Sequence, residues 1–435
     1  MKKTLLTICL VWMCFSLSAQ KIIDLSGKWS FSIDRQDNGE KEKWFSHTLN
    51  DFINLPGSMP EKLKGDEVTA KTQWTGSLYD SSYYYNPYME KYRKEGNIKF
   101  PFFLTPDKHY VGAAWYQKEV NIPADWKGER ILLFLERPHI ETTVWVNGQK
   151  TGMQNSLCVP HQYDITRYVR PGKCTITIRV DNRIKEINVG PDSHSITDQT
   201  QGNWNGIVGR ICLQTTPKTY FDDIQIYPEP EQKLARVKVV IKGTGTAKVK
   251  LSAESFNTDK KHIVPAIQQE IKLNKGVTET EMVLPMGNDM LLWDEFHPAL
   301  YKLKAEVTNG KKTEIKEIQF GMRRFEIKGK WFYVNGRKTQ LRGTVENCDF
   351  PLTGYAPMDV ESWERVFRIC RSYGLNHMRF HSFCPPEAAF MAADRVGFYL
   401  QPEGPSWPNH GPKLGLGQPI DKYLMDETIA LTKEY

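Results

Sequence analysis

Residues 377–387, HMRFHSFCPPE, place an arginine and a histidine in a short run that has the alternation of a β-strand. Met378 and Phe380 alternate with Arg379 and His381, and the prolines that follow stop the run. A strand that is buried on both faces carries apolar side chains throughout, so polar side chains near its end indicate a polar site. A guanidinium suits carboxylates of the protein or of a ligand, and an imidazole suits a hydroxyl group.

Further candidates follow the neighbouring predicted strands. Glu403 in the segment QPEGPSW could bind a hydroxyl group, a cation or a nearby arginine, and Trp407 could form a platform against the apolar face of a sugar ring. Asn347 follows the first predicted strand of this region. We expect these residues to bind substrate, although Arg379 is equally compatible with an internal ion pair.

The elements that must position these residues alternate between strands and helices. The predicted strands are 339–347, 377–383 and 398–404, and the predicted helices are 359–374, 386–397 and 421–435. Asp359 can cap the first of these helices, Trp363 and Phe367 share one face, and Gly374 ends it. Such alternation predicts a parallel sheet, in which polar groups at the carboxyl ends of the strands line the site.

The preceding part of the chain has the pattern of β-structure. From about 22 to 217, short alternating runs such as VWVNG (144–148) predict an antiparallel β-sandwich, in which Asn147-Gly148 forms a hairpin turn. Residues 72–112 interrupt it with a long loop that is rich in aromatic residues. From 219 to 320, three alternating runs predict an immunoglobulin-like sandwich whose lysines face outward and whose Leu303, Ala305 and Val307 face inward.

The first 19 residues have the pattern of a secretory signal. Two lysines precede an apolar run that is too short to span a bilayer, and Ala19 ends a plausible cleavage site. We therefore expect a periplasmic or secreted protein without a membrane span. The net charge of +7 over 435 residues is too weak to predict nucleic-acid binding. The cysteines lack paired CxxC spacing, so we expect neither a zinc site nor a disulfide framework, although a single bridge is compatible with the sequence.

The chain resembles glycoside hydrolase family 2, the family of the β-galactosidases, β-glucuronidases and β-mannosidases. The resemblance extends over nearly all of the chain after the signal. The motifs that carry it are LSGKW (25–29), AAWYQKEVNIP (113–123), VWVNGQKTG (144–152), YDITRYVRPG (163–172), QGNWNGIVGRICL (201–213), FGMRRFEI (320–327) and GLNHMRFHSFCPPEAAFMAADRVGFYLQPEG (374–404).

This resemblance implies a multidomain β plus α/β fold of three domains after a signal peptide. The implied order is a signal peptide at 1–19, a jelly-roll sugar-binding domain at 20–218, an immunoglobulin-like domain at 219–321 and the first part of a TIM (β/α)8 barrel at 322–435. Of the first domain, Gln201, Asn203 and Trp204 match the family segment that leans towards the barrel, so we expect Asn203 and Trp204 to contact substrate.

Members of the family hydrolyse β-glycosides with retention, which needs two carboxyl groups about 5–5.5 Å apart. The family's acid belongs to an Asn-Glu pair after the fourth barrel strand, and no Asn-Glu pair occurs after residue 322. We therefore expect no catalytic residue in this chain, which by itself hydrolyses nothing and is a piece of a longer glycosidase. Asn347 and Asp349 replace histidines that are frequent in the family's galactosidases, which weakens the expectation of galactose specificity.

Two function classes therefore compete. The first is a retaining exo-β-glycosidase of the β-galactosidase or β-glucuronidase type, and the alternative is a non-catalytic exported carbohydrate-binding protein. For both we expect a β-linked glycan as partner, no cofactor and no metal, and a homo-oligomer is compatible with either. A third alternative, a protein-interaction scaffold, gives no role to the polar residues at the strand ends, so it ranks last.

Overall fold

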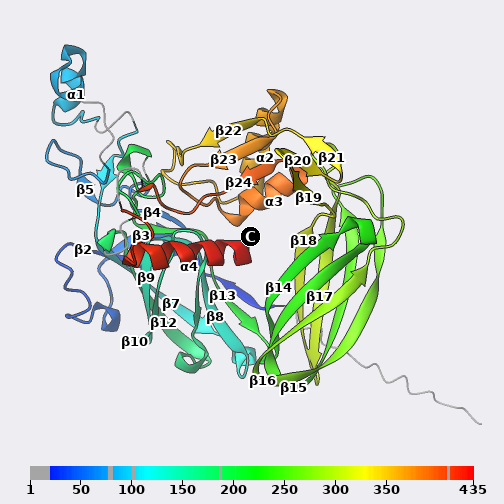
Figure 1. Cartoon of the computed structure of the whole chain (residues 1–435). Coiled ribbons are helices and arrows are strands. Elements are labelled where there is room, and N and C mark those ends of the chain that lie inside the picture. The colour runs from blue at the N-terminus through cyan, green and yellow to red at the C-terminus, as the bar shows by residue number, and fades with distance from the viewer. Residues whose placement is uncertain (1–19, 77–81, 100–103, 186–188, 201, 409–411) are drawn as a thin grey trace, which may run out of the picture.

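The computed structural model describes residues 20–76, 82–99, 104–185, 189–200, 202–408 and 412–435. The predicted signal at 1–19 lies outside the described residues. Two β-rich regions are followed by a mixed region of strands and helices (Figure 1). We refer to the regions 20–218, 219–321 and 322–435 as the first, second and third domains.

The first domain consists of two antiparallel sheets that enclose one apolar core. One sheet contains β1 (Ile22–Asp24), β4 (Gly57–Ser58), β8 (Arg130–His139), β11 (His161–Asp164) and β13 (Gly206–Thr216). The other contains β2 (Gly27–Asp34), β3 (Asp51–Leu55), β7 (Ala113–Ile122), β9 (Glu141–Val146), β10 (Gln149–Asn155) and β12 (Gly172–Asp181). A two-stranded pair, β5 (Asp66–Glu67) and β6 (Lys108–His109), lies outside both sheets.

Local turn chemistry sets the β9–β10 hairpin. Asn147 and Gly148 have φ values of 50° and 76°, as a type I′ turn requires at both of its central positions. The predicted hairpin is therefore confirmed. Val144 and Val146 point into the core between the sheets, whereas Trp145 points to the opposite face and is buried there against Trp115.

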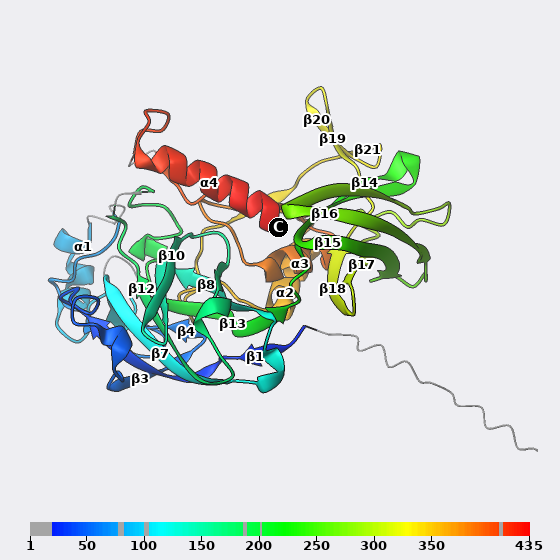
Figure 2. The same cartoon turned by 90° about the horizontal axis from the view of Figure 1, so that it is seen from below.

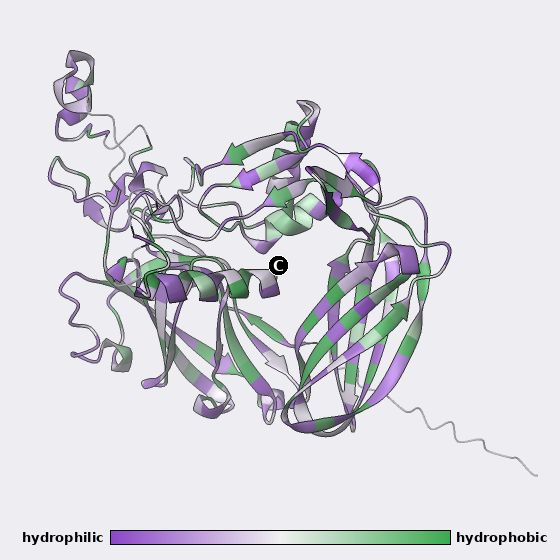
Figure 3. Ribbon diagram, viewed as in Figure 1, coloured by the Kyte–Doolittle hydropathy of each residue, from purple (hydrophilic) through white to green (hydrophobic). Residues whose placement is uncertain are grey.

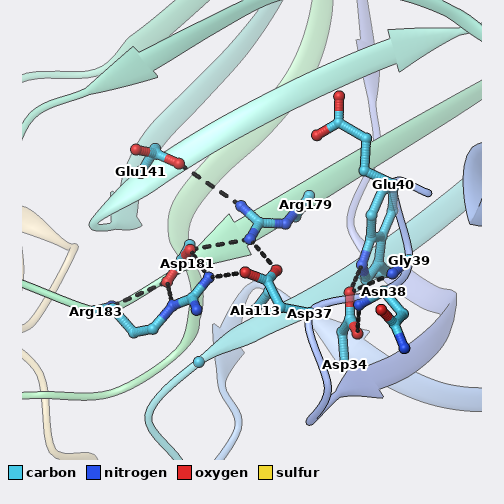
Figure 4. Close-up of polar contacts among 12 residues, drawn as sticks. Asp34, Asp37, Asn38, Gly39, Glu40, Ala113, Glu141, Arg179, Asp181 and Arg183 are labelled. Atoms are coloured by element: carbon cyan, nitrogen blue, oxygen red, sulfur yellow. Dashed lines mark hydrogen bonds and ion pairs between the residues drawn. The ribbon is translucent and has the colours of Figure 1, made fainter. Parts of the chain in front are cut away.

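Charged side chains bind the loop after β2 to the face of the sheet on which Trp115 and Trp145 lie (Figure 4). Asp34 accepts hydrogen bonds from the indole of Trp115 at 2.9 Å and from the amide of Gly39 at 2.8 Å. Arg179 of β12 pairs with Asp37 at 2.6 Å and with Asp181 at 3.1 Å. Burial opposes ionisation of Asp181, but hydrogen bonds from Arg183 and from a lysine outweigh it and hold its pKa below the usual value.

The aromatic-rich segment lies partly outside the described residues, which resume with α1 (Ser82–Tyr85). Tyr83 and Ile98 form a small cluster of their own, against which Trp74 and Tyr92 pack. Figure 1 shows α1 standing away from the sheets of the first domain.

The second domain is built around two 23-residue strands, β15 (Leu234–Phe256) and β16 (Ile263–Pro285). The other strands are β14 (Tyr220–Glu229), β17 (Leu300–Asn309) and β18 (Lys312–Phe320). Two of the three predicted alternating runs, 235–243 and 246–255, are parts of the single strand β15. A bulge between Gly243 and Gly245 interrupts its register, and β15 pairs with β14 before the bulge and with β17 after it.

Alternation along β17 is as predicted, because Leu303, Ala305 and Val307 are fully buried whereas Lys302 is exposed. Figure 3 shows the same alternation of hydrophilic and hydrophobic residues along the neighbouring strands. The buried residues of the second domain form one apolar core.

The third domain begins with a small antiparallel sheet of β19 (Phe325–Lys328), β20 (Trp331–Val334) and β21 (Arg337–Thr339). A parallel sheet follows, with β23 (His377–Phe380) between β22 (Gly343–Glu346) and β24 (Tyr399–Gln401). The predicted strand at 377–383 is thus shorter than expected, and His381 lies immediately after its end.

Two helices connect these parallel strands, namely α2 (Val360–Ser372) and α3 (Glu387–Val396). Asp359 caps α2 by accepting a hydrogen bond from the amide of Ser362 at 2.8 Å, as predicted. Trp363 and Phe367 of α2 are buried against Phe380 of β23, so the apolar faces of helix and strand share one core.

The last helix, α4 (Pro419–Glu434), packs against the first domain. Its Ile420 and Tyr423 join Ile140, Leu157 and Ile196 in an apolar cluster. Figure 2 shows α4 lying alongside the strands of the first domain. Within the described residues, no helix is long and apolar enough to cross a membrane.

Candidate functional site

Arg379 and Glu403 form an ion pair across the carboxyl ends of β23 and β24. The Arg379 Nε donates to Glu403 Oε1 at 2.5 Å, and the amide of Ser382 donates to Glu403 Oε2 at 2.9 Å. Burial acts to raise the pKa of Glu403, but these two hydrogen bonds outweigh it and hold the pKa below its usual value. Glu403 is therefore ionised at neutral pH, and both of its oxygens are engaged in holding the strand ends together.

His381 lies beside this pair and is held by the residues after β22. Its amide donates to the carbonyl of Glu346 at 3.0 Å, and its Nδ1 lies 3.2 Å from Asn347 Oδ1. The oxygen of Asn347 needs a donor, which places the proton on Nδ1 and leaves Nε2 as an acceptor. Burial, followed by the charge of Arg379, lowers the pKa of His381.

A histidine of the first domain completes the cluster. The His194 ring lies 4.2 Å from that of His381 and stacks on Trp407, with centroids 5.2 Å apart and planes 15° apart. The Trp407 ring also lies 5.2 Å from His381, and the Trp407 amide donates to the carbonyl of Val189 at 3.1 Å. Residues from two domains thus make one surface of three rings.

Ser382 connects the two domains at this point. Its hydroxyl accepts from the His194 amide at 2.8 Å and lies 2.9 Å from His194 Nδ1. Since a hydroxyl oxygen can accept two hydrogen bonds, this contact is compatible with either neutral tautomer of His194. Ser193 and Ser195 donate to the Ser382 carbonyl at 3.3 and 2.6 Å, and Ser382 itself has a left-handed φ of 51°.

Burial, followed by the nearby charges of His381 and Arg379, lowers the pKa of His194 to about 4. His194 is only 7% exposed. The ring is therefore neutral near pH 7, where it serves as a hydrogen-bonding group without charge.

Two acids at the end of β22 and just after it stabilise the loop that follows this strand. The Glu346 carboxylate accepts from the Asp349 amide at 3.1 Å, and burial raises the pKa of both carboxyl groups. In the part of the chain that the structure describes, no group of three or more His, Cys, Asp and Glu side chains is placed to hold a metal ion.

Asn203 and Trp204 have other partners. Asn203 accepts from Asn182 at 3.0 Å and donates to Thr75 at 2.9 Å, so both ends of its amide are used within the first domain. Trp204 stacks on His139 and lies 5.7 Å from Tyr355 of the third domain. These two residues help to line a cavity of about 300 Å³ between the domains. Gln201 lies outside the described residues.

The structure therefore gathers five of the seven predicted residues. Arg379 is paired with Glu403, His381 lies within 3.2 Å of Asn347, and the His381 ring lies beside that of Trp407. Sequence reasoning missed His194 and Ser382. His194 lies 188 residues before Ser382 in a segment without a strand or helix pattern, and no local signal identifies such a contact.

Two family models and several known proteins match this chain. The family model described as "Glycosyl hydrolases family 2, sugar binding domain" matches residues 22–217, and a second model, "Glycosyl hydrolases family 2", matches residues 219–323. Human beta-glucuronidase is 23% identical over 420 residues, which cover 88% of this chain and 57% of that protein. A beta-galactosidase of Thermoanaerobacter pseudethanolicus is 24% identical, over 72% of this chain and 42% of that protein.

Solved structures show the same fold at low identity. A β-glucuronidase from Ruminococcus gnavus in complex with D-glucaro-d-lactam superposes with a TM-score of 0.66 at 19% identity, over 95% of this chain and 63% of that one. A glycosyl hydrolase family 2 member from Bacteroides cellulosilyticus gives 0.68 at 20% identity, over 95% of this chain and 51% of that one. The chain spans about half the length of the curated relatives that it matches.

Proposed function

The chain belongs to glycoside hydrolase family 2, and on this premise we propose that it forms the sugar-holding part of an exported, retaining exo-β-glycosidase. The proposed substrate is a β-linked glycan with a terminal galactose or glucuronic acid, because relatives named beta-galactosidase and beta-glucuronidase both match the chain. The predicted signal at 1–19 supports a periplasmic or secreted location.

We further propose that the third domain is the beginning of a (β/α)8 barrel. Three parallel strands connected by α2 and α3 agree with that architecture, and the polar cluster lies at the carboxyl ends of the strands, where barrel enzymes place their sites. The glycosidase activity of the whole protein would then depend on carboxyl groups outside this chain.

The observation that carries the proposal is the cluster around His381. Trp407 supplies an aromatic ring, His381 supplies an acceptor at Nε2, and neutral His194 packs against both rings, a combination that suits the apolar face and the hydroxyl groups of a pyranose. The state of Glu403 supports sugar binding without hydrolysis. Its carboxylate is ionised, and its two oxygens are already bound to Arg379 and to the Ser382 amide.

Two assays test the proposal together. In saturation-transfer NMR, the chain should bind free galactose or glucuronic acid, and in a colour assay it should release no nitrophenol from the corresponding β-glycosides. Loss of sugar binding in Trp407→Ala, but not in a Trp331→Ala control on the hairpin β20–β21, would place the sugar at the cluster. Binding that survives in Trp407→Ala, or turnover by the chain itself, would contradict the proposal.

A further inference from the structure

Arg137 of β8 joins the first domain to the third. Its Nη1 donates to the carbonyl of Leu157 at 2.7 Å and to that of Cys384 at 3.2 Å. Its Nη2 donates to the carbonyl of Pro385 at 3.1 Å and to the hydroxyl of Tyr435 at 3.2 Å. One guanidinium therefore holds the chain segments around 157 and around 384 on either side of itself.

Two cysteines lie at this junction. Cys158 directly follows Leu157, and its carbonyl accepts a hydrogen bond from Tyr435 at 3.3 Å. The side chains of Cys158 and Cys384 are hydrogen-bonded to each other, which brings together two free thiols that are 226 positions apart in the sequence. Cys158 is completely buried and Cys384 is 4% exposed.

The surroundings make the two thiols unequal. The hydrogen bond with Cys158 lowers the pKa of Cys384, and the charge of Arg137 adds to this effect although burial opposes it. The same hydrogen bond and burial raise the pKa of Cys158 well above its usual value. These shifts belong to the docked domains, in which the two side chains lie against each other and near Arg137.

We propose that Cys158 and Cys384 form a disulfide that links the first domain to the third. During folding, the thiolate of one of the two cysteines attacks one sulfur of a small-molecule disulfide such as glutathione disulfide, which gives a mixed disulfide and one released thiolate. The other cysteine then loses its proton and attacks the protein sulfur of the mixed disulfide, which releases the second thiolate. Two protein thiols are oxidised to one disulfide, and one small-molecule disulfide is reduced to two thiols.

The location that the first residues predict agrees with this chemistry, because disulfides persist in exported proteins. The cavity beside Cys384 has a volume of about 60 Å³, which is smaller than glutathione. The exchange therefore takes place while the domains dock during folding, and the test uses refolding. The inference does not depend on the proposed sugar binding.

Cys348 is the competing partner, because it lines the same cavity as Cys384. Burial raises the pKa of its thiol, and nearby Glu346 and Asp349 add to that effect, but Cys158 is the cysteine whose side chain is hydrogen-bonded to that of Cys384. Among the remaining cysteines, Cys174 lies in the core of the first domain. The pairing that we propose is thus specific and can be read by peptide mapping.

The experiment is refolding of the chain from urea in a buffer of reduced and oxidised glutathione. The remaining thiols are alkylated under denaturing conditions, and the unreduced digest is analysed by mass spectrometry. We expect one cross-linked peptide pair, which contains Cys158 and Cys384, with Cys174, Cys212, Cys348 and Cys370 alkylated. Alkylation of all six cysteines after residue 19, or a Cys348–Cys384 link, would overturn the proposal.

Variants supply a second readout. The Cys158→Ala variant should leave Cys384 alkylated, whereas the Cys212→Ala control should keep the cross-link. Adding reductant should lower the thermal midpoint of the refolded wild-type chain and leave that of Cys158→Ala unchanged. The peptide mapping uses the wild-type chain, so it tests the proposal even if a variant fails to fold. A thermal midpoint of the wild-type chain that does not change on adding reductant would also contradict the disulfide.

Discussion

The ring of His194 in the first domain lies 4.2 Å from the ring of His381 at the end of β23. This contact means that the candidate site belongs to two domains, because His194 and Ser382 bind each other through two polar contacts at 2.8 and 2.9 Å. The site should therefore respond to changes in the docking of the domains as well as to changes in its own side chains.

Replacing Ser382 by alanine should destabilise this junction. The change removes the acceptor of the His194 amide and leaves a donor unpaired in a buried position, which costs about 1–3 kcal/mol. Urea denaturation of wild-type and variant chains measures the difference in unfolding free energy. The control is Ser372→Ala at the exposed end of α2, which should change stability by less than about 0.5 kcal/mol. Equal effects of the two changes would refute the role given to Ser382.

The stability of the junction should depend on the ionisation of His194. Its pKa is about 4 in the folded chain against an ordinary value of 6.5, so the folded state binds its proton more weakly than the unfolded state. The stabilisation that the neutral His194 ring contributes is therefore fully present above pH 6.5 and is lost as the pH falls from 6.5 towards 4.

The His194→Gln variant isolates this effect, because glutamine does not titrate. The unfolding free energy of the wild-type chain should fall relative to that of the variant between pH 6.5 and 4. A constant difference across that range would mean that His194 is not buried as a neutral ring.

The Arg379–Glu403 pair should show a measurable coupling energy. The two side chains are 37% and 26% exposed, and the hydrogen bond from the Ser382 amide fixes the Glu403 carboxylate, so we expect a coupling of about 1 kcal/mol. A double-mutant cycle with Arg379→Ala and Glu403→Gln measures it. The i,i+4 pair of Arg368 and Glu364 on α2 is the comparison, with an expected coupling of about 0.3–0.5 kcal/mol. No coupling between Arg379 and Glu403 would contradict the geometry.

Phe380 should be essential to the core of the third domain. It is fully buried and contacts Trp363 and Phe383, so Phe380→Ala should cost about 3–5 kcal/mol. The control, Ile369→Ala, changes a residue of α2 that is 49% exposed and should cost much less. Denaturation monitored by tryptophan fluorescence gives both values, and a small effect of Phe380→Ala would show that the strand is not part of this core.

Features set by local chemistry could be predicted from the sequence. The Asn147-Gly148 turn, the Asp359 cap of α2 and the alternation of Leu303, Ala305 and Val307 depend on neighbouring residues, and all appear in the structure. Contacts between segments that are distant in the chain could not be predicted, because no pattern near His194 indicates that it reaches Ser382.

Prediction of the candidate site met the same difficulty, because some of its contacts join segments that are distant in the chain. Adjacent parallel strands bring their carboxyl ends together, so Arg379 and Glu403 could be placed at one edge, but the sequence left substrate binding and an ion pair open, and the structure shows the ion pair. For Asn203, the hydrogen bonds to Asn182 and Thr75 depend on how loops of the first domain fold against each other, and no periodic pattern specifies that arrangement.

The most direct test of the account is a titration of the chain with galactose and with glucuronic acid, followed by NMR of the tryptophan indoles and histidine rings. We predict saturable shifts of the Trp407 and His381 signals with one of the two sugars, assigned through Trp407→Ala and His381→Gln, while the signal of Trp331 stays unchanged. Shifts of Trp331 alone, or no shift of Trp407 and His381 at saturating concentrations of either sugar, would contradict the claim that these strand ends hold a sugar.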